Sequence, residues 1–218
     1  MSIGRWIKRI LGLIVAVGVA YGLLLLVPAQ AEPIALDALE GVPPVEGEGG
    51  STVDEDRDRI VIYPGSNEPG AGFIFYPGGL VDPRAYAHIL TPIAEAGYLV
   101  VIPKPPFDLA FADVGAATDI IADFPSIEVW AVGGHSLGGV AAATFVSGSP
   151  NASRFLVLWA SYPATDMSSL DELRVLSVSG TEDGLTTTDD VAASVDDLPA
   201  RTKFVALEGV VHRYVGHY

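Results

Sequence analysis

The sequence predicts one α/β domain with a mainly parallel sheet covered by helices on both faces, and two observations support this prediction. First, strand patterns and helix patterns alternate from Ile60 to the end of the 218-residue chain. Second, most of the strand patterns are apolar at successive positions, which is typical of strands buried on both faces. A chain of this length can bury one sizeable core. We find no internal repeat, and we expect no second domain.

Residues rich in glycine and proline separate the predicted elements. Seven apolar runs are expected to form strands, at residues 59–65, 72–79, 98–104, 127–134, 154–161, 173–180 and 203–209. Helical patterns occupy residues 83–97, 113–124, 137–148 and 187–198. In the first of these helices, Asp82 is the predicted N-cap, Pro83 suits the first helical position, Pro92 introduces a bend and Gly97 ends the helix. The acidic segment 32–59 is expected to combine a short tether with weak opening structure.

The first 31 residues form a separate segment. Three basic residues, Arg5, Lys8 and Arg9, precede residues 10–27, a run of 18 residues without a charge. A secretory signal peptide would be cleaved after Ala31, whereas a retained run would anchor the chain in a membrane. The length of the run favours the anchor slightly. Both interpretations place the rest of the chain outside the cytoplasm, membrane-anchored or secreted.

Residues 32–218 form the predicted catalytic domain and are strongly acidic. They hold all 27 Asp and Glu residues and nine of the twelve Lys and Arg residues, a balance of −18. Such a charge repels phosphates, so we expect no nucleic-acid partner. The chain contains no cysteine, which excludes disulfides, a thiol nucleophile and thiolate metal ligands. No metal and no organic cofactor are expected.

A Gly-x-Ser-x-Gly motif lies where a predicted strand gives way to a predicted helix. It consists of Gly134, His135, Ser136, Leu137 and Gly138. A sharp strand-turn-helix connection of this kind raises the serine above the edge of a sheet, where it can act as a nucleophile. The alternative is a structural turn with an incidental serine. A nucleophilic serine also needs a base, a carboxylate that orients the base, and two N–H donors for an oxyanion.

The acid and the base should follow the serine in that order, on loops after later strands. Asp183 follows the strand at 173–180 and is the predicted acid, with Glu182 in reserve and Asp166 as a more distant third candidate. His212 follows the last strand and is the predicted base. His217 is the alternative base, although it is next to last in the chain and is expected to be too mobile.

The predicted oxyanion donors are the backbone N–H groups of Leu137 and Gly79, with Leu80 as the alternative to Gly79. Leu137 follows the nucleophile, and Gly79 lies in the loop after the strand at 72–79. The turn at the motif should point the side chain of His135 elsewhere.

The substrate site is expected to be open. Only twelve residues, 161–172, separate two of the strands, which leaves no room for a large lid. Phe107, Phe111 and Tyr162 are the candidate contacts for an acyl group.

With these parts in place, the chain resembles the alpha/beta-hydrolase superfamily, and most closely its compact branch, alpha/beta hydrolase family 5. The resemblance depends on the blocks "GFIFYPGGLVDPRAYAHILTPIAEAGYLVVIPK", "WAVGGHSLGGVAAA", "WASYPATDMSSL" and "GTEDGL". It implies a nucleophile, acid and base at Ser136, Asp183 and His212. The chain departs from the branch near its end, where Val210 and Val211 replace the usual Gly-Asn and the usual last helix is missing.

The expected function is an exported or membrane-anchored serine hydrolase that acts on a small-molecule acyl substrate, with a carboxylic ester as the default. Two other functions stay open: a non-catalytic cell-surface binding protein on the same fold, and an envelope acyltransferase. A mechanism like that of dienelactone hydrolases is disfavoured, because those relatives use cysteine where this chain has Ser136.

Overall fold

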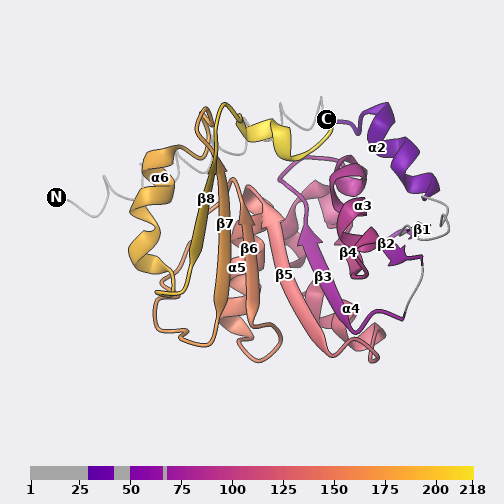
Figure 1. Cartoon of the computed structure of the whole chain (residues 1–218), viewed down its shortest axis with the longest axis horizontal. Coiled ribbons are helices and arrows are strands. Elements are labelled where there is room, and N and C mark those ends of the chain that lie inside the picture. The colour runs from indigo at the N-terminus through magenta and orange to yellow at the C-terminus, as the bar shows by residue number, and fades with distance from the viewer. Residues whose placement is uncertain (1–28, 42–49, 66–67) are drawn as a thin grey trace, which may run out of the picture.

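The computed structural model describes residues 29–41, 50–65 and 68–218, which are arranged around an eight-stranded sheet (Figure 1). The strand order is β1-β2-β4-β3-β5-β6-β7-β8. β1 and β2 pair antiparallel, as do β2 and β4, and all the other neighbours pair parallel. The strands are β1 Ser51–Glu55, β2 Arg59–Pro64, β3 Ala71–Tyr76, β4 Leu99–Pro103, β5 Val129–His135, β6 Phe155–Trp159, β7 Arg174–Gly180 and β8 Lys203–Leu207. The predicted mainly parallel sheet is confirmed.

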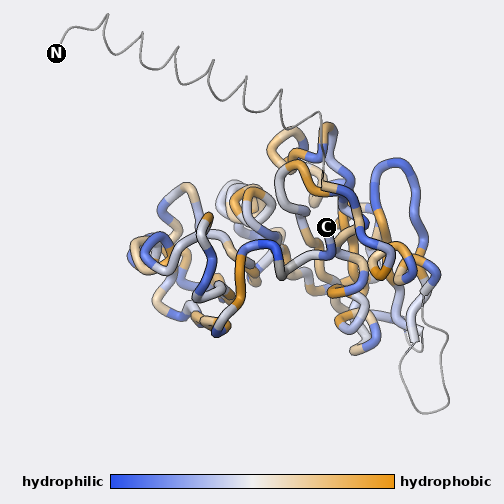
Figure 2. The backbone as a smooth tube through the Cα atoms, turned by 90° about the horizontal axis from the view of Figure 1, so that it is seen from above, coloured by the Kyte–Doolittle hydropathy of each residue, from blue (hydrophilic) through white to orange (hydrophobic). Residues whose placement is uncertain are grey.

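Helices cover both faces of this sheet. They are α2 Pro33–Asp37, α3 Ala87–Glu95, α4 Ala116–Asp123, α5 Leu137–Gly148 and α6 Thr188–Ala193. α4 and α5 bury their apolar residues in one core cluster, and α3 packs in a second cluster with residues of β2, β3 and β4. Seen from above, apolar and polar segments alternate along the chain (Figure 2), as expected where each element turns one side to a core.

All seven predicted strands are present, but the sequence analysis missed β1. This strand has the sequence STVDE and lies at the edge of the sheet, where only Ser51 is buried. An edge strand with two solvent-facing sides needs few apolar side chains, so the pattern that identifies buried strands is absent here. The acidic opening segment therefore contains a strand and the short helix α2 besides its connecting residues.

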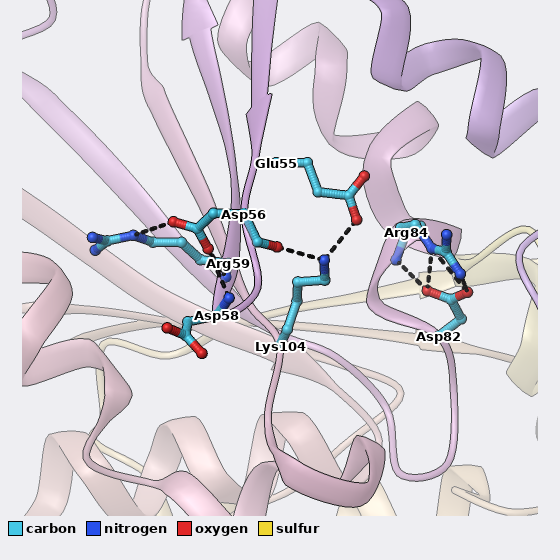
Figure 3. Close-up of polar contacts among 7 residues, drawn as sticks. All are labelled: Glu55, Asp56, Asp58, Arg59, Asp82, Arg84 and Lys104. Carbon is cyan, nitrogen blue, oxygen red and sulfur yellow. Dashed lines mark hydrogen bonds and ion pairs between the residues drawn. The ribbon is translucent and has the colours of Figure 1, made fainter.

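Polar contacts hold the turn between β1 and β2 against the end of β4 (Figure 3). The Asp56 carboxylate accepts hydrogen bonds from the N–H groups of Asp58 at 2.7 Å and Arg59 at 2.8 Å. These bonds lower the pKa of the Asp56 carboxyl. Lys104, which follows β4, donates to Glu55 Oε1 at 2.6 Å and to the Asp56 carbonyl at 2.7 Å. The backbone hydrogen bonds of the edge strand are thus reinforced by side chains.

The helix predicted at residue 83 begins as expected. Asp82 accepts a hydrogen bond from the Arg84 N–H at 3.0 Å and also binds the Arg84 guanidinium (Figure 3). The first turn, Pro83–Tyr86, is a 3₁₀ helix that leads into α3, and Pro92 lies inside α3. The chain leaves the helix at Gly97, whose φ of +99° suits glycine.

Residues 29–32 lie on the surface of the domain beside the loop that follows β3. Ala29 forms a bridge with Val81, donates to the Leu80 carbonyl at 3.3 Å and accepts from the Asp82 N–H at 3.1 Å. The predicted membrane or signal segment falls almost entirely on residues 1–28, which lie outside the described residues. Among the described helices, none combines the length and the apolar character that a membrane crossing requires.

An apolar groove of about 650 Å³ runs over β5, β6 and β7 on the face that α3 covers only in part. Phe155, Val157 and Trp159 of β6 line it, whereas Leu158 of the same strand is fully buried in the core cluster that contains α5. The two faces of this end of the sheet therefore differ in how well they are covered by the described residues.

Candidate active site

Ser136 connects β5 to α5 in a backbone conformation that non-glycine residues rarely adopt, with φ 52° and ψ −123°. Such a conformation costs about 1–3 kcal/mol and persists only when its surroundings hold it. Here the Ser136 N–H donates to the Trp159 carbonyl at 2.9 Å. The Ser136 carbonyl accepts from the Ser161 hydroxyl at 2.8 Å and from the Gly139 N–H at 3.0 Å. The structure thus places Ser136 in the sharp strand-to-helix turn that the motif predicted.

The two glycines of the motif are required by close packing around this turn. A Cβ atom on Gly138 would overlap the carbonyl oxygens of Tyr76 and Pro77 at the end of β3. A Cβ on Gly134 would come within 2.5 Å of the Gly138 backbone. Because glycine has no side chain, α5 can begin directly beside the end of β3. This close approach brings Ser136 next to the loop that follows β3.

Asp183 and His212, predicted as acid and base, are joined by a hydrogen bond. His212 Nδ1 lies 2.8 Å from Asp183 Oδ2. Asp183 Oδ1 accepts the N–H groups of Leu185 and Thr186, each at 2.8 Å, and the Asp183 side chain is fully buried. A carboxylate only accepts hydrogen bonds, so Nδ1 of His212 carries a proton and Nε2 of the neutral ring is the basic atom.

His212 lies beside the turn that carries Ser136. Its ring centroid is 4.7 Å from that of His135, the neighbour of the serine. Among the described residues, no hydrogen bond joins the Ser136 hydroxyl to the His212 ring. Hydrogen bonds of this kind are often long before substrate binds and tighten in the complex.

The reserve candidates are both exposed to solvent. Glu182 is exposed, and Asp166 is exposed and accepts the Ser168 N–H at 2.9 Å. The His217 N–H donates to the Ala85 carbonyl at 3.0 Å, and the His217 carbonyl accepts from the Glu32 N–H at 2.9 Å. Among the described residues, its ring contacts Glu32 and His88 rather than Asp183.

The loop after β3 leaves one candidate oxyanion donor without a partner among the described residues. The Gly78 N–H donates to the Tyr86 hydroxyl at 3.0 Å, and the Leu80 N–H donates to the Asp108 carbonyl at 2.7 Å. The Gly79 N–H between them has no partner in the described part of the chain. The Leu137 N–H opens α5 and likewise has none there, as expected for a first helical residue. Of the two alternatives, Gly79 is therefore better suited than Leu80.

Gly79 and Leu137 are also neighbours in space. A Cβ added to Gly79 would lie 2.6 Å from Leu137 Cδ1. The two unpartnered N–H groups therefore come from residues in contact across the gap between the β3 loop and the start of α5.

His135 has a place that the sequence analysis missed. Its side chain is only 1% exposed and contacts residues from other parts of the site. Nδ1 lies 2.8 Å from the Tyr86 hydroxyl, and Nε2 lies 3.1 Å from the His212 carbonyl. Burial and then the nearby His212 lower the pKa of His135 to about 3, so the ring is neutral near pH 7. No local sequence signal indicates these contacts.

Large exposed apolar side chains follow four successive strands at the edge of the sheet that carries Ser136. The predicted contacts Phe107, Phe111 and Tyr162 are 74%, 47% and 38% exposed. Leu137, which is 46% exposed, and Leu185, which is 76% exposed, were not predicted as contacts. All five follow the carboxyl ends of β4, β5, β6 and β7, Leu137 as the first residue of α5, so the carboxyl edge of the sheet is apolar on several sides. In the described ranges, no three His, Asp or Glu residues are grouped so that they could hold a metal ion.

A comparison with protein families agrees with this architecture. Residues 72–218 match the model of an alpha/beta hydrolase family. This chain belongs to the α/β hydrolase family. The predicted resemblance is confirmed, and the eight-stranded sheet of this α/β hydrolase, with its antiparallel β2, accounts for the match in structural terms.

Solved structures share the fold of this α/β hydrolase at low sequence identity. A predicted CIB-like hydrolase from Thermoplasma acidophilum matches with a TM-score of 0.59 and 16% identity, over 77% of this chain and 92% of that chain. An α/β hydrolase enzyme from the metagenome of lagoon sediments at Mar Chica, Morocco, gives 0.58 and 14%, over 73% and 89%. An esterase from Pyrobaculum calidifontis gives 0.60 and 14%, over 83% and 81%. No curated protein matches this α/β hydrolase at a significant level.

Proposed function

We propose that this α/β hydrolase is a serine esterase with Ser136 as nucleophile, His212 as base and Asp183 as the residue that orients the base. The observation that carries the proposal is the buried hydrogen bond of 2.8 Å between Asp183 and His212, beside a serine held in a strained turn. The fold and the hydrolases and esterase among its structural neighbours support a hydrolase in general.

In this mechanism the Ser136 hydroxyl attacks the carbonyl carbon of an ester while its proton passes to His212 Nε2. The Asp183 carboxylate offsets the positive charge that develops on the ring. The N–H groups of Gly79 and Leu137 stabilise the negative charge on the carbonyl oxygen. The alcohol leaves with the proton from His212, and an acyl group remains on Ser136. A water molecule, deprotonated by His212, then releases the acid and restores the serine.

The substrate that we propose is a small ester with an apolar acyl group. The exposed side chains of Phe107, Phe111, Tyr162 and Leu185 support this choice, because apolar surface next to the nucleophile stabilises apolar substrate groups. The Pyrobaculum calidifontis protein of similar fold is an esterase.

We also propose that the domain lies outside the cytoplasm, anchored through residues 10–27 or secreted after cleavage at Ala31. The contacts of Ala29 with Leu80 and Asp82 support retention, since cleavage after Ala31 would remove Ala29 from the loop beside the proposed oxyanion donor. Mass spectrometry of the N-terminus of the exported protein distinguishes the two. A chain beginning at Glu32 would contradict the anchor.

The proposed activity is tested with a fluorophosphonate probe and p-nitrophenyl esters on the full chain. We expect labelling and ester hydrolysis in the wild type and in Ser168→Ala, whose serine is exposed on a loop. Ser136→Ala should abolish labelling, and both it and His212→Ala should abolish hydrolysis. Equal labelling of wild type and Ser136→Ala would falsify the assignment of the nucleophile. No labelling of the wild type would favour the non-catalytic binding protein, and ester products formed with added alcohols would favour an acyltransferase.

A further inference from the structure

His135 is a buried histidine that belongs to neither the proposed triad nor the proposed oxyanion hole. It is the last residue of β5, and both of its ring nitrogens have partners. Nδ1 lies 2.8 Å from the hydroxyl of Tyr86, at the start of α3, and Nε2 lies 3.1 Å from the backbone carbonyl of His212. The ring thus lies between two segments of the site that are more than 120 residues apart in the chain.

The donors and acceptors in this cluster, together with the neutral state of the buried His135 ring, favour one arrangement of protons. The Tyr86 oxygen accepts from the Gly78 N–H at 3.0 Å, and its single proton is then available to His135 Nδ1. Burial raises the pKa of Tyr86, so the hydroxyl keeps this proton. At the other end, the His212 carbonyl can only accept, so Nε2 of His135 must carry a proton. The His212 carbonyl thus requires the proton on Nε2. Burial lowers the pKa of His135 to about 3 and keeps the ring neutral, so Nδ1 is unprotonated and accepts from the Tyr86 hydroxyl.

This chain of hydrogen bonds ends on the two loops that the proposed reaction uses. Gly78 directly precedes Gly79, and its N–H is held through Tyr86. The ring of His212 is held at Nδ1 by Asp183, and its backbone is held at the carbonyl by His135. The packing around Gly78 is close, because a Cβ there would lie 2.7 Å from the Tyr86 hydroxyl and 2.8 Å from His135 Nδ1.

We propose that His135 is a positioning residue that, together with Tyr86, holds the oxyanion loop and the base loop at a constant separation. The proposal rests on the proposed function, since it assigns these loops to the reaction. A constant separation matters in the transition state more than in substrate binding, because both the oxyanion donor and the base must reach the same carbonyl group at once. The effect of breaking the chain of bonds should therefore fall on kcat.

The first test is the position of the proton, which needs no activity. In ¹⁵N spectra of the full chain, with the His135→Gln variant used for assignment, Nδ1 of His135 should be unprotonated and Nε2 protonated. This state should persist from about pH 8 to about pH 5, across the range in which an ordinary histidine titrates. A proton on Nδ1, or titration of His135 within that range, would overturn the proposal.

The second test compares two buried tyrosines in steady-state kinetics with p-nitrophenyl butyrate. Tyr86→Phe should lower kcat by about 10- to 100-fold, with KM within about threefold of the wild type. The matched control is Tyr76→Phe. Like the Tyr86 hydroxyl, the Tyr76 hydroxyl donates one hydrogen bond and accepts one backbone N–H, but its partners are the Val114 carbonyl and the Ala117 N–H in the core on the opposite face. It should lose a similar amount of thermal stability and keep its kcat within about threefold.

A double variant tests whether Tyr86 and His135 act as one unit. The effects of substitutions within one hydrogen-bond network are not additive. The double variant Tyr86→Phe/His135→Gln should therefore lose no more kcat than the more affected of the two single variants. Additive losses of kcat, or a Tyr86→Phe variant with the kcat of the wild type, would overturn the positioning role of His135 and Tyr86 but not the proposed function. An inactive wild type would overturn both this proposal and the proposed function, whereas the ¹⁵N result would then still report on the hydrogen bonds.

Discussion

Replacing Asp183 with asparagine tests how the base is oriented, because the structure determines which way the new amide must face. Oδ1 of Asp183 accepts two backbone N–H groups, from Leu185 and Thr186, each at 2.8 Å. The amide oxygen of Asp183→Asn must occupy this position, since an NH₂ group there would face two donors. The NH₂ group then takes the place of Oδ2 and points at Nδ1 of His212, 2.8 Å away in the wild type.

This arrangement forces the imidazole into the wrong tautomer. Nδ1 of His212 must accept from the amide, so the proton moves to Nε2, which can no longer take the proton of Ser136. Loss of the correct tautomer in a triad of this kind lowers kcat about 10⁴-fold, or about 5 kcal/mol of activation free energy. Folding should be affected less, because all the hydrogen bonds of the buried side chain can still form, and we expect a loss of about 1–3 kcal/mol for the exchanged charge-assisted bond.

The assay is the steady-state hydrolysis of p-nitrophenyl butyrate, measured beside thermal unfolding. The matched control is Asp166→Asn, because Asp166 is exposed, lies on the preceding loop and, within the described ranges, hydrogen-bonds only to Ser168. We expect the control to keep its activity within about twofold. If Asp183→Asn retained more than a tenth of the wild-type kcat while folded, the orienting role of Asp183 would be refuted. Glu182 would then be the next candidate for the residue that orients His212.

Three further predictions concern stability. Gly138→Ala should destabilise the domain by several kcal/mol, about 3 or more in urea unfolding, because its Cβ would overlap the Tyr76 carbonyl; a stable variant would contradict the close approach of α5. The pKa of His135 is about 3 in the folded protein and about 6.5 in the unfolded chain. Between these pH values the unfolded state binds more protons than the folded state. The free energy of unfolding should therefore fall as the pH drops from about 6.5 to about 3, by at most about 5 kcal/mol. Unfolding curves for His135→Gln, compared over the same pH range, should show a shallower decline, and equal slopes would argue against a buried neutral ring. Lys104→Met removes a partly exposed ion pair with Glu55 and should cost no more than about 1 kcal/mol in urea, with ester hydrolysis within about twofold of the wild type; a larger loss of activity would place the turn at the site.

The local pattern of the sequence was sufficient to predict most of the secondary structure. Buried strands are continuous apolar runs, whereas helices repeat their apolar residues at helical spacing, so β2 to β8 and α3 to α6 could be recognised before any contact was known. The same local reasoning predicted Ser136, because a strand before the motif and a helix after it are adjacent in sequence. It failed at β1, where an edge strand needs no apolar pattern, and it did not indicate that His217 contacts Glu32, which precedes α2, and His88 in α3.

The sequence by itself determined the fold class, and it predicted a nucleophile and a short set of acids and bases in the order that a triad requires. Only the tertiary structure showed which members of that set lie together. It buried Asp183 against His212 and left Glu182 in solvent, and it occupied the Leu80 N–H while leaving that of Gly79 without a described partner. It also brought His135 to the backbone of His212. Each of these outcomes depends on contacts between loops that are distant in the chain. Such contacts follow from the order of the strands in the sheet, and the local pattern of apolar residues does not indicate that order.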